Sequence, residues 1–599
     1  MCELRRIDRQ PPANAAVFTT LYEAAHLLVA LTLAAYPWLL ACAIVDPAPS
    51  HRLFWLGAIG VQALCLIARP VQSWVLKILT LTLLAGLCLI QAGVVYNNIV
   101  TSAVAQDYFL IASWLSASSH TLLTAPVALA ENYQFSYMQY YFDPITPLIN
   151  RITHLTNHPF RMLGFHLAAL LSAPIVTWVI LSQSKNLTPF QALLPVSLMM
   201  HPSLMYTIQA DYHTSGIGIS PLLIGTYLFW SSSSKSAFAT LLLGTFTKVS
   251  YWPSWMMFAV IHGWKRQWRW MAIYTAVGLS AISTYRLIQT SHGIDSILGN
   301  LGLAKTVTMT LPEMISSLLT RPIYIRETSI IFLWFVIFML LPFGFTMFRR
   351  PITLVPILPL VALSILDQLS FRSIMFNVYA VEYLGFITAA IIVGLNGSRR
   401  RVQAMMSIAI TLGLLLSNSN PYQWIAWNPE ESYARHLFDR ERFYSTHFYR
   451  DGLRSRWPNT LAALDRYTQA VAFSECAIGD ASVIVTTYQW ASYVRGSWDR
   501  VWVLEGDRPL NSSVWENTET LVYAANPRAQ GSLTYFPDIP AGFDKSRLGL
   551  LMLKLPVTVS TKESMYEWRY LGGQRLADCA VRYGYNTEPT VAGETWLHR

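Results

Sequence analysis

The chain has 599 residues, of which 53% are hydrophobic and only 13% are charged. A soluble chain of this length would carry about a quarter charged residues, so the composition excludes an ordinary globular protein and indicates an integral membrane protein. The net charge of +10 does not indicate nucleic-acid binding, because the basic residues lie in short clusters between apolar runs, as expected of membrane topology.

The first ten residues are basic, and an apolar run follows from about Val17 to Val45. It is too long for the core of a cleavable signal peptide, so we expect it to be the first membrane-spanning helix. About thirteen runs are long enough to cross a bilayer, or nearly so. They lie near 17–45, 53–68, 73–95, 160–182, 188–208, 215–231, 236–248, 250–263, 270–288, 329–347, 352–366, 378–395 and 403–417. The run 236–248 is short, which predicts a tilted or broken helix, or one arm of a re-entrant pair with 250–263.

Basic clusters occur at every second turn of this series. They are Arg5/Arg6/Arg9, Arg69, Lys185, Lys235, Lys265/Arg266/Arg269, Arg349/Arg350 and Arg399/Arg400/Arg401. Because cytoplasmic loops are enriched in Lys and Arg, the pattern predicts a cytoplasmic N-terminus. The loop 97–158, the turns at Asp211 and Lys248, the segments 289–328 and 367–377, and everything after about 418 then face outward.

The composition changes near 418, where the chain becomes charged and rich in Trp and Tyr. Strand-like runs alternate with helical patterns, which predicts a small α/β domain at 418–599 after a transmembrane module at 1–417. The strand-like runs are 481–487, 500–504 and 520–524, and one helical pattern is 458–473.

Only two of the six cysteines, Cys476 and Cys579, belong to this polar C-terminal region. An outward location is oxidising, so we expect them to form a disulfide; two separate buried thiols are the alternative. The clustered Cys/His spacing of a zinc site is absent from the sequence, so no metal ligands and no cofactor are indicated, and a requirement for another divalent metal stays open.

The outward loop 97–158 holds the candidate for catalysis. Asp107 follows the third apolar run, and 108–118 has the pattern of an interfacial helix. A carboxylate there can deprotonate an incoming hydroxyl where a lipid-borne donor presents its head group. A helix-capping or solvated aspartate is the alternative.

Other outward turns contribute further polar residues. Lys248 lies between two apolar arms on the side where cations are disfavoured, and such a lysine should face a cavity and an anion. Asp211 and His213 can orient a sugar or contact a phosphate, or simply form a polar helix end. Glu382, within or just inside a span, either pairs with a base such as Arg372 or lines the same cavity.

Four cations also fall on the outward side, against the charge rule: Lys305, Arg321, Arg326 and Arg372. They are either solvated residues of long loops or ligands of an anionic group at the membrane surface. Polar groups from four outward turns, distant in sequence, are thus predicted to converge on one side of the membrane.

Asp107 in the first outward loop, the interfacial helix after it, the many spans and the C-terminal domain together resemble the GT-C superfamily of membrane glycosyltransferases. Within it, the chain is similar to an uncharacterised bacterial family of multi-pass membrane proteins. The short motifs follow the family's order: Gln106-Asp107-Tyr108, Phe142-Asp143-Pro144-Ile145, His201-Pro202 through Asp211-Tyr212-His213, Thr247-Lys248, Phe376-Asn377-Val378-Tyr379-Ala380 and Gly479-Asp480-Ala481-Ser482-Val483.

The resemblance implies an inverting transfer of a sugar from a polyprenyl-phosphate donor to a glycan or lipid acceptor on the outer side of the bacterial cytoplasmic membrane. Asp107 would be the general base, and Asp143 and Asp211 would orient sugar hydroxyls. The lipid phosphate would be held by Lys248, His213 and a basic residue from Arg321, Arg326 and Arg372, with Tyr379 and Glu382 in the same substrate site. No metal is indicated.

Two other functions stay open. A multi-pass transporter or lipid flippase shares this layout, although it would place polar groups near the bilayer midplane and usually has two related halves. A catalytically silent scaffold is the other, because Tyr108 stands where many GT-C enzymes carry a second acid.

Overall fold

The fold is taken from a computed structural model. It describes residues 73–100, 144–146, 148–149, 161–183, 188–210, 212–231, 234–290, 322–366, 380–395, 400–417, 425–430, 435, 438–439, 468–469, 471–473, 475–476, 484–487, 501–504, 520–523, 550–554, 567–571, 579, 581–583, 586–589 and 595–598.

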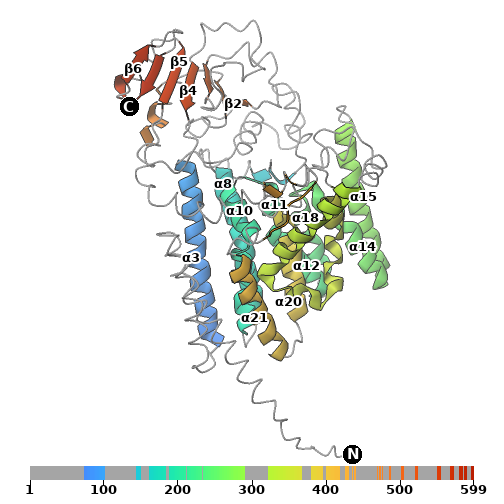
Figure 1. Cartoon of the computed structure of the whole chain (residues 1–599). Helices are drawn as coiled ribbons and strands as arrows, with labels where there is room; N and C mark the ends of the chain where they lie inside the picture. The colour runs from blue at the N-terminus through green and yellow to red at the C-terminus, as the bar shows by residue number, and fades with distance from the viewer. Residues whose placement is uncertain are drawn as a thin grey trace, which may run out of the picture.

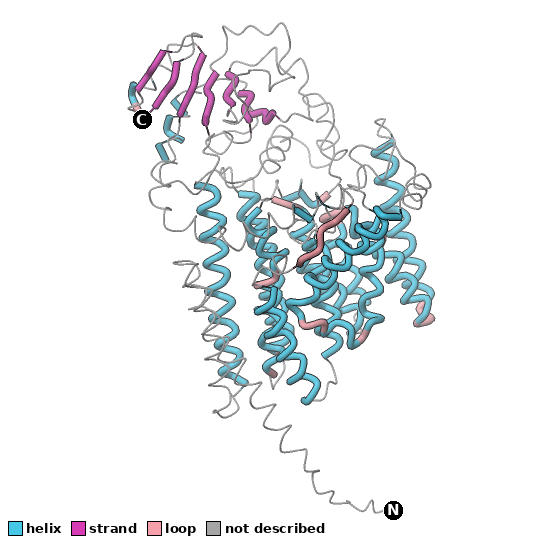
Figure 2. Tube along the Cα trace, viewed as in Figure 1, coloured by secondary structure: helices cyan, strands magenta, loops and turns pink. Residues whose placement is uncertain are grey.

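The described residues up to 417 form a bundle of α-helices, drawn in Figures 1 and 2. This confirms the prediction of an α-helical bundle for that part of the chain. The helices are α3 (Ser73–Val100), α8 (Arg161–Ser182), α9 (Pro189–Met199), α10 (Pro202–Ala210), α11 (Thr214–Ile217), α12 (Ile219–Ser231), α13 (Ser234–Thr245), α14 (Ser254–Trp264), α15 (Trp268–Thr290), α18 (Pro322–Leu340), α19 (Leu358–Leu366), α20 (Leu384–Leu395) and α21 (Arg400–Ser417). Short 3₁₀ segments join several of them: η2 (Val249–Tyr251), η3 (Leu341–Phe343), η4 (Thr346–Arg349), η5 (Pro351–Ile357) and η7 (Ala380–Tyr383).

Helix α20 is the centre of the bundle. All twelve of its residues are buried, as expected of a helix that is apolar on every side. It packs against α12, which in turn packs against α13, and glycines allow these close approaches. A Cβ on Gly385 would lie 2.7 Å from the carbonyl oxygen of Ile219, so only glycine fits between α20 and α12 there.

The expected span 188–208 is interrupted. It consists of α9 and α10, and the break falls at His201. Pro202 has no backbone N–H to continue a helix through this point. His201 is held at the break: its Nε2 is 2.9 Å from the carbonyl oxygen of Met339, its Nδ1 accepts from the Ser203 N–H, and its ring stacks on Phe343. The apolar run 188–208 thus consists of two helices that meet at His201.

Two helices within the described residues are long and apolar enough to cross a membrane, at Leu76–Tyr96 and Met162–Ser182. Shorter apolar helical stretches lie at Ser329–Phe343, Pro351–Ser364, Ala380–Leu395 and Met405–Leu414. The expected spans 17–45 and 53–68 lie outside the described residues. As predicted, the run 236–248 gives only a short helix, the twelve-residue α13.

The described strands form one seven-stranded sheet in the order β2-β1-β3-β4-β5-β7-β6. Pairing is parallel from β2 to β4 and antiparallel for the remaining pairs. The strands are β1 (Ile484–Thr487), β2 (Val501–Leu504), β3 (Thr520–Tyr523), β4 (Leu550–Lys554), β5 (Glu567–Leu571), β6 (Asn586–Pro589) and β7 (Thr595–His598). The first three fall within the runs that the sequence analysis expected to be strands.

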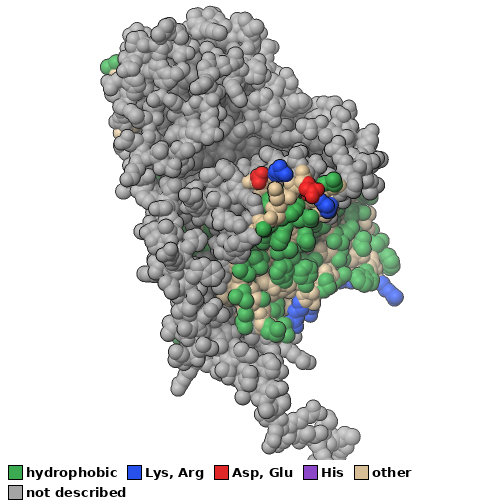
Figure 3. Space-filling model, viewed as in Figure 1, with side chains coloured by type: hydrophobic (Ala, Val, Ile, Leu, Met, Phe, Trp, Pro, Cys, Tyr) green, Lys and Arg blue, Asp and Glu red, His purple; other side chains and the backbone are tan. Residues whose placement is uncertain are grey.

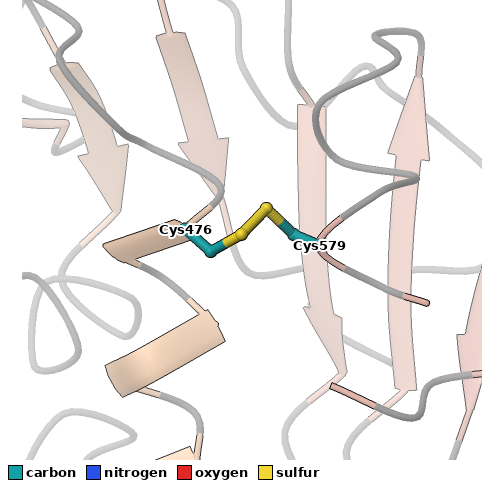
Figure 4. The surroundings of a disulfide bond; sticks show 2 residues. All are labelled: Cys476 and Cys579. Atoms are coloured by element: carbon teal, nitrogen blue, oxygen red, sulfur yellow. A yellow bond between two sulfur atoms is a disulfide. The ribbon is translucent and has the colours of Figure 1, made fainter. Parts of the chain in front are cut away.

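Cys476 and Cys579 are joined by a disulfide, with Cα atoms 5.9 Å apart. Figure 4 shows the bridge between the helical turn that holds Cys476 and the segment that holds Cys579, beside the strands. The pairing agrees with the one expected from the sequence.

Candidate functional site

The candidate site forms around Lys248, in the turn that follows α13. The hydroxyl of Thr247 donates to the carbonyl oxygen of Gly244, and the N–H of Lys248 contacts the carbonyl oxygen of Thr245. The indoles of Trp252 and Trp255 donate to the carbonyl and hydroxyl oxygens of Thr245. These bonds use the carbonyl groups at the end of α13 and fix the backbone that presents Lys248.

A carboxylate from another part of the chain meets this lysine. Glu382, in η7 just before α20, places Oε1 3.5 Å from the Lys248 Nζ, and the two side chains are only 1% and 12% exposed. The Ser215 hydroxyl donates to the same Oε1 at 3.0 Å. A carboxylate so buried requires such partners, because an isolated charge out of water is costly.

His213 is the second partner of the lysine. Its Nε2 lies 3.2 Å from the Lys248 Nζ. An ammonium group can only donate, so Nε2 accepts and the imidazole proton of His213 belongs on Nδ1. The backbone N–H of His213 in turn donates to Nε2 of His166 on α8. We call Lys248, Glu382, His213 and Ser215 the Lys248 cluster.

Close packing holds α11 against the turn 246–248, which we call the lysine turn. Tyr251 donates its hydroxyl to the Ser215 carbonyl oxygen at 2.8 Å. A Cβ on Gly218 would lie only 2.4 Å from the Thr247 hydroxyl oxygen, so the junction of α11 and α12 touches the turn directly. Ser215 and Lys248 therefore keep a fixed separation.

The described end of the loop 97–158 reaches the same region. The hydroxyls of Thr146 and Tyr212, both buried, are hydrogen bonded at 2.9 Å. The Tyr212 ring lies 5.3 Å from that of His166, and Tyr212 directly precedes His213. Thr146 is thus linked, through Tyr212, to the backbone that carries His213.

Of the residues predicted for the site, the structure brings together Lys248, His213 and Glu382. Glu382 pairs with Lys248. Arg372, the base suggested for it from the sequence, lies outside the described residues, so that pairing stays a prediction. Arg326 stands apart, since its ion-pair partners are Glu327 and Glu430, and neither belongs to the Lys248 cluster. The other predicted site residues lie outside the described residues: Asp107, Asp143, Asp211, Arg321, Arg372 and Tyr379.

Three residues of this region were not predicted from the sequence: Ser215, Tyr251 and His166. A histidine within an apolar run is a signal that could have been used, because polar groups in such runs tend to be functional or paired. Ser215 lies among small residues and gives no comparable signal. Within the described ranges, no three His, Cys, Asp or Glu side chains come together as metal ligands.

The cluster can therefore present a shielded cation whose position is set by a carboxylate and a neutral imidazole. Such a group suits an anion that arrives from the cluster's partly exposed side. No protein-family model matches this chain, and neither a curated protein nor a solved structure matches it.

Proposed function

We propose that this chain is a multi-pass membrane glycosyltransferase that uses a polyprenyl-phosphate sugar donor, and that the Lys248 cluster receives the donor phosphate. The observation on which this rests is the buried cation at the end of an apolar bundle, assembled from turns that are distant in sequence. Lysine in such a setting is costly and is typical of a functional site.

A membrane location is supported by the exterior of the bundle. Large apolar side chains are exposed on several helices: Trp74, Leu81 and Leu89 on α3, Val179 on α8, Leu333 on α18 and Leu412 on α21. In Figure 3 a broad apolar face lies between a lower edge with Lys and Arg and an upper edge where acids and bases occur together. An apolar belt with cations at one end is the pattern of a cytoplasmic-membrane protein.

The disulfide supports the proposed orientation. Cys476 and Cys579 are bonded, and disulfides persist in oxidising compartments. Residues 418–599 would then lie outside the cytoplasm, over the end of the bundle where α11 lies and where Figure 1 places the sheet. The basic turns would face the cytoplasm, and the full set of about thirteen spans belongs to this proposal.

In the proposed reaction an acceptor hydroxyl attacks the anomeric carbon of the donor sugar. Asp107 takes the hydroxyl proton, the bond from the anomeric carbon to the phosphate oxygen breaks, and the lipid phosphate leaves with the electron pair. Negative charge grows on that phosphate in the transition state, which Lys248 would stabilise. Glu382 is a positioning residue here, since it touches the lysine. The role of Asp107 is based on the sequence alone.

Two alternatives have some support. Each member of the Lys248 cluster has a partner within the protein, which favours a structural ion pair in a catalytically silent scaffold. The interruption of the helical path at His201 favours a transporter, because transporters use broken helices. His201 is fully engaged by Met339 and Ser203, however, so the break is explained by structure.

Lipid extraction from a deletion strain tests the transfer reaction even while the sugar is unidentified. The strain should accumulate a prenyl-linked sugar, and the wild-type gene should remove it. Asp107→Asn and Lys248→Met, expressed to wild-type levels, should leave the lipid in place. No accumulated lipid, or full complementation by Asp107→Asn, would rule out the proposed enzyme.

A further inference from the structure

The end of the bundle opposite the Lys248 cluster carries only cations among its described charged side chains. Lys77, near the start of α3, is half-buried, and the exposed ones are Lys235, Lys265, Arg266, Arg269, Arg349 and Arg350. Figure 3 shows Lys and Arg, without Asp or Glu, along the lower edge of the apolar face. Such a surface complements an anionic one.

The turn between α14 and α15 differs from the rest of this end because it also exposes tryptophans. Trp264 is 74% exposed and Trp268 is 62% exposed, and they flank Lys265 and Arg266. Indoles are enriched where a membrane meets water, because they combine an apolar ring with a polar N–H. Exposed tryptophans between cations are thus suited to the headgroup level of a bilayer.

Lys265 has a defined position in this turn. Its Nζ lies 4.4 Å from the ring centroid of Trp230 and 4.8 Å from that of Phe229, so the ammonium is attracted to both ring faces. Partial burial under its neighbours lowers the pKa of the Lys265 ammonium, which means that part of its hydration has been lost. An anion above the rings would compensate for that loss.

A second donor stands beside the lysine. The indole Nε1–H of Trp230 is buried and has no hydrogen-bond partner among the described residues. The Lys265 Nζ lies 4.4 Å from the centroid of the same ring, so the two donors are close neighbours. Buried N–H groups normally find an acceptor, so an acceptor is to be expected at this place.

We propose that the α14–α15 turn binds the headgroup phosphate of an anionic phospholipid between the Lys265 ammonium and the Trp230 N–H, with Trp264 and Trp268 at headgroup level. This site requires only that the bundle lies in a membrane. It does not depend on sugar transfer, and it lies at the opposite end from the Lys248 cluster.

Native mass spectrometry of the full-length protein tests the site. The protein is equilibrated with equal amounts of phosphatidylglycerol and phosphatidylcholine, and retained lipid is counted. Wild type should retain phosphatidylglycerol preferentially. Lys265→Met keeps the aliphatic stem over the rings and should lower that preference about fivefold, the effect of one cation at a membrane surface. Lys265→Arg should keep it.

Lys235→Met is the matched control, because it removes an exposed cation from the same end of the bundle. It should change retention little. Trp230→Phe removes only the second donor and keeps a ring, and it should also weaken retention, which provides a test if Lys265→Met fails to fold. Equal losses in Lys235→Met and Lys265→Met would overturn the site in favour of diffuse charge. Displacement of the lipid by millimolar inorganic phosphate would overturn the lipid assignment.

Discussion

Lys248 and Glu382 form a buried ion pair, 3.5 Å between Nζ and Oε1, that joins the turn after α13 to the start of the central helix α20. Glu382 is anchored in turn by the hydroxyl of Ser215. The pair therefore connects three elements at one end of an apolar bundle, and the proposed phosphate site is built on it.

Removing one member of this pair should cost more stability than removing both. Lys248→Met removes the ammonium beside the buried Glu382 carboxylate, and the loss of stability is expected to be about 3 kcal/mol. The double variant Lys248→Met with Glu382→Gln removes both charges and should recover most of that loss. The free energies of unfolding of the two variants are compared in detergent, with heat or a denaturant as the unfolding agent. Additive losses in the double variant would show that the two charges do not interact.

Gly218→Ala should loosen the lysine turn. The added Cβ would lie 2.4 Å from the Thr247 hydroxyl oxygen and 3.1 Å from the Gly244 carbonyl oxygen, so the turn must shift at a cost of about 1–3 kcal/mol. Gly86→Ala on α3 is the control, because no atom lies within 4 Å of its Cβ position and alanine favours a helix. The melting temperatures of Gly218→Ala and Gly86→Ala are compared with that of the wild type. Equal values for the two variants would mean that the turn accommodates the added methyl group at no cost.

The disulfide should protect both of its cysteines from alkylation until a reductant is added. Peptide mass mapping after thiol labelling measures this. Cys476→Ser should expose Cys579 to the label and lower the stability of the C-terminal region by about 2–4 kcal/mol. Cys88→Ser, at a free thiol in α3, should leave that region unchanged. Labelling of Cys579 in unreduced wild-type protein would contradict the oxidising location.

Retention of anionic lipid should fall as the pH rises. Burial lowers the pKa of Lys265, so its ammonium loses the proton at a lower pH than an ordinary lysine, whose pKa is about 10.4. The charge is complete below that lowered pKa and lost above it. A series from pH 8 to pH 10.5 lies above the ordinary titration range of the neighbouring His262.

Lys265→Arg should keep the lipid over the whole series, because a guanidinium does not titrate there. A wild-type curve that stays flat to pH 10.5, or that falls together with the Lys265→Arg curve, would show that Lys265 does not hold the headgroup.

Much of the helical framework could be predicted from the sequence, because apolar runs of helical length are visible without any tertiary information. The short α13 and the first three strands were predicted in this way. The break at His201 was not, since the partners that hold it, Met339 and Phe343, lie in a distant helix and the 3₁₀ segment after it. Pro202 alone does not distinguish a break from a kink.

The site could be predicted only in part for a similar reason. Lys248 and Glu382 were noticeable because charged residues are costly in apolar surroundings. Their partnership was not visible, since pairing depends on how α11, η7 and the lysine turn pack. Ser215 gave no signal at all, because a serine between small residues is common in any helix.

The most direct test of the account is the affinity of the purified full-length protein for a polyprenyl phosphate, measured for the wild type and for the double variant Lys248→Met with Glu382→Gln. The double variant removes both charges of the pair together. A loss of affinity in this variant therefore reports the loss of the phosphate contact and not a loss of stability. The account predicts a loss of affinity of about tenfold or more, the effect of losing a charged hydrogen bond to the phosphate. Lys235→Met, at the other end of the bundle, should bind as the wild type does. Equal affinity of the double variant and the wild type would contradict the claim that Lys248 receives the lipid phosphate.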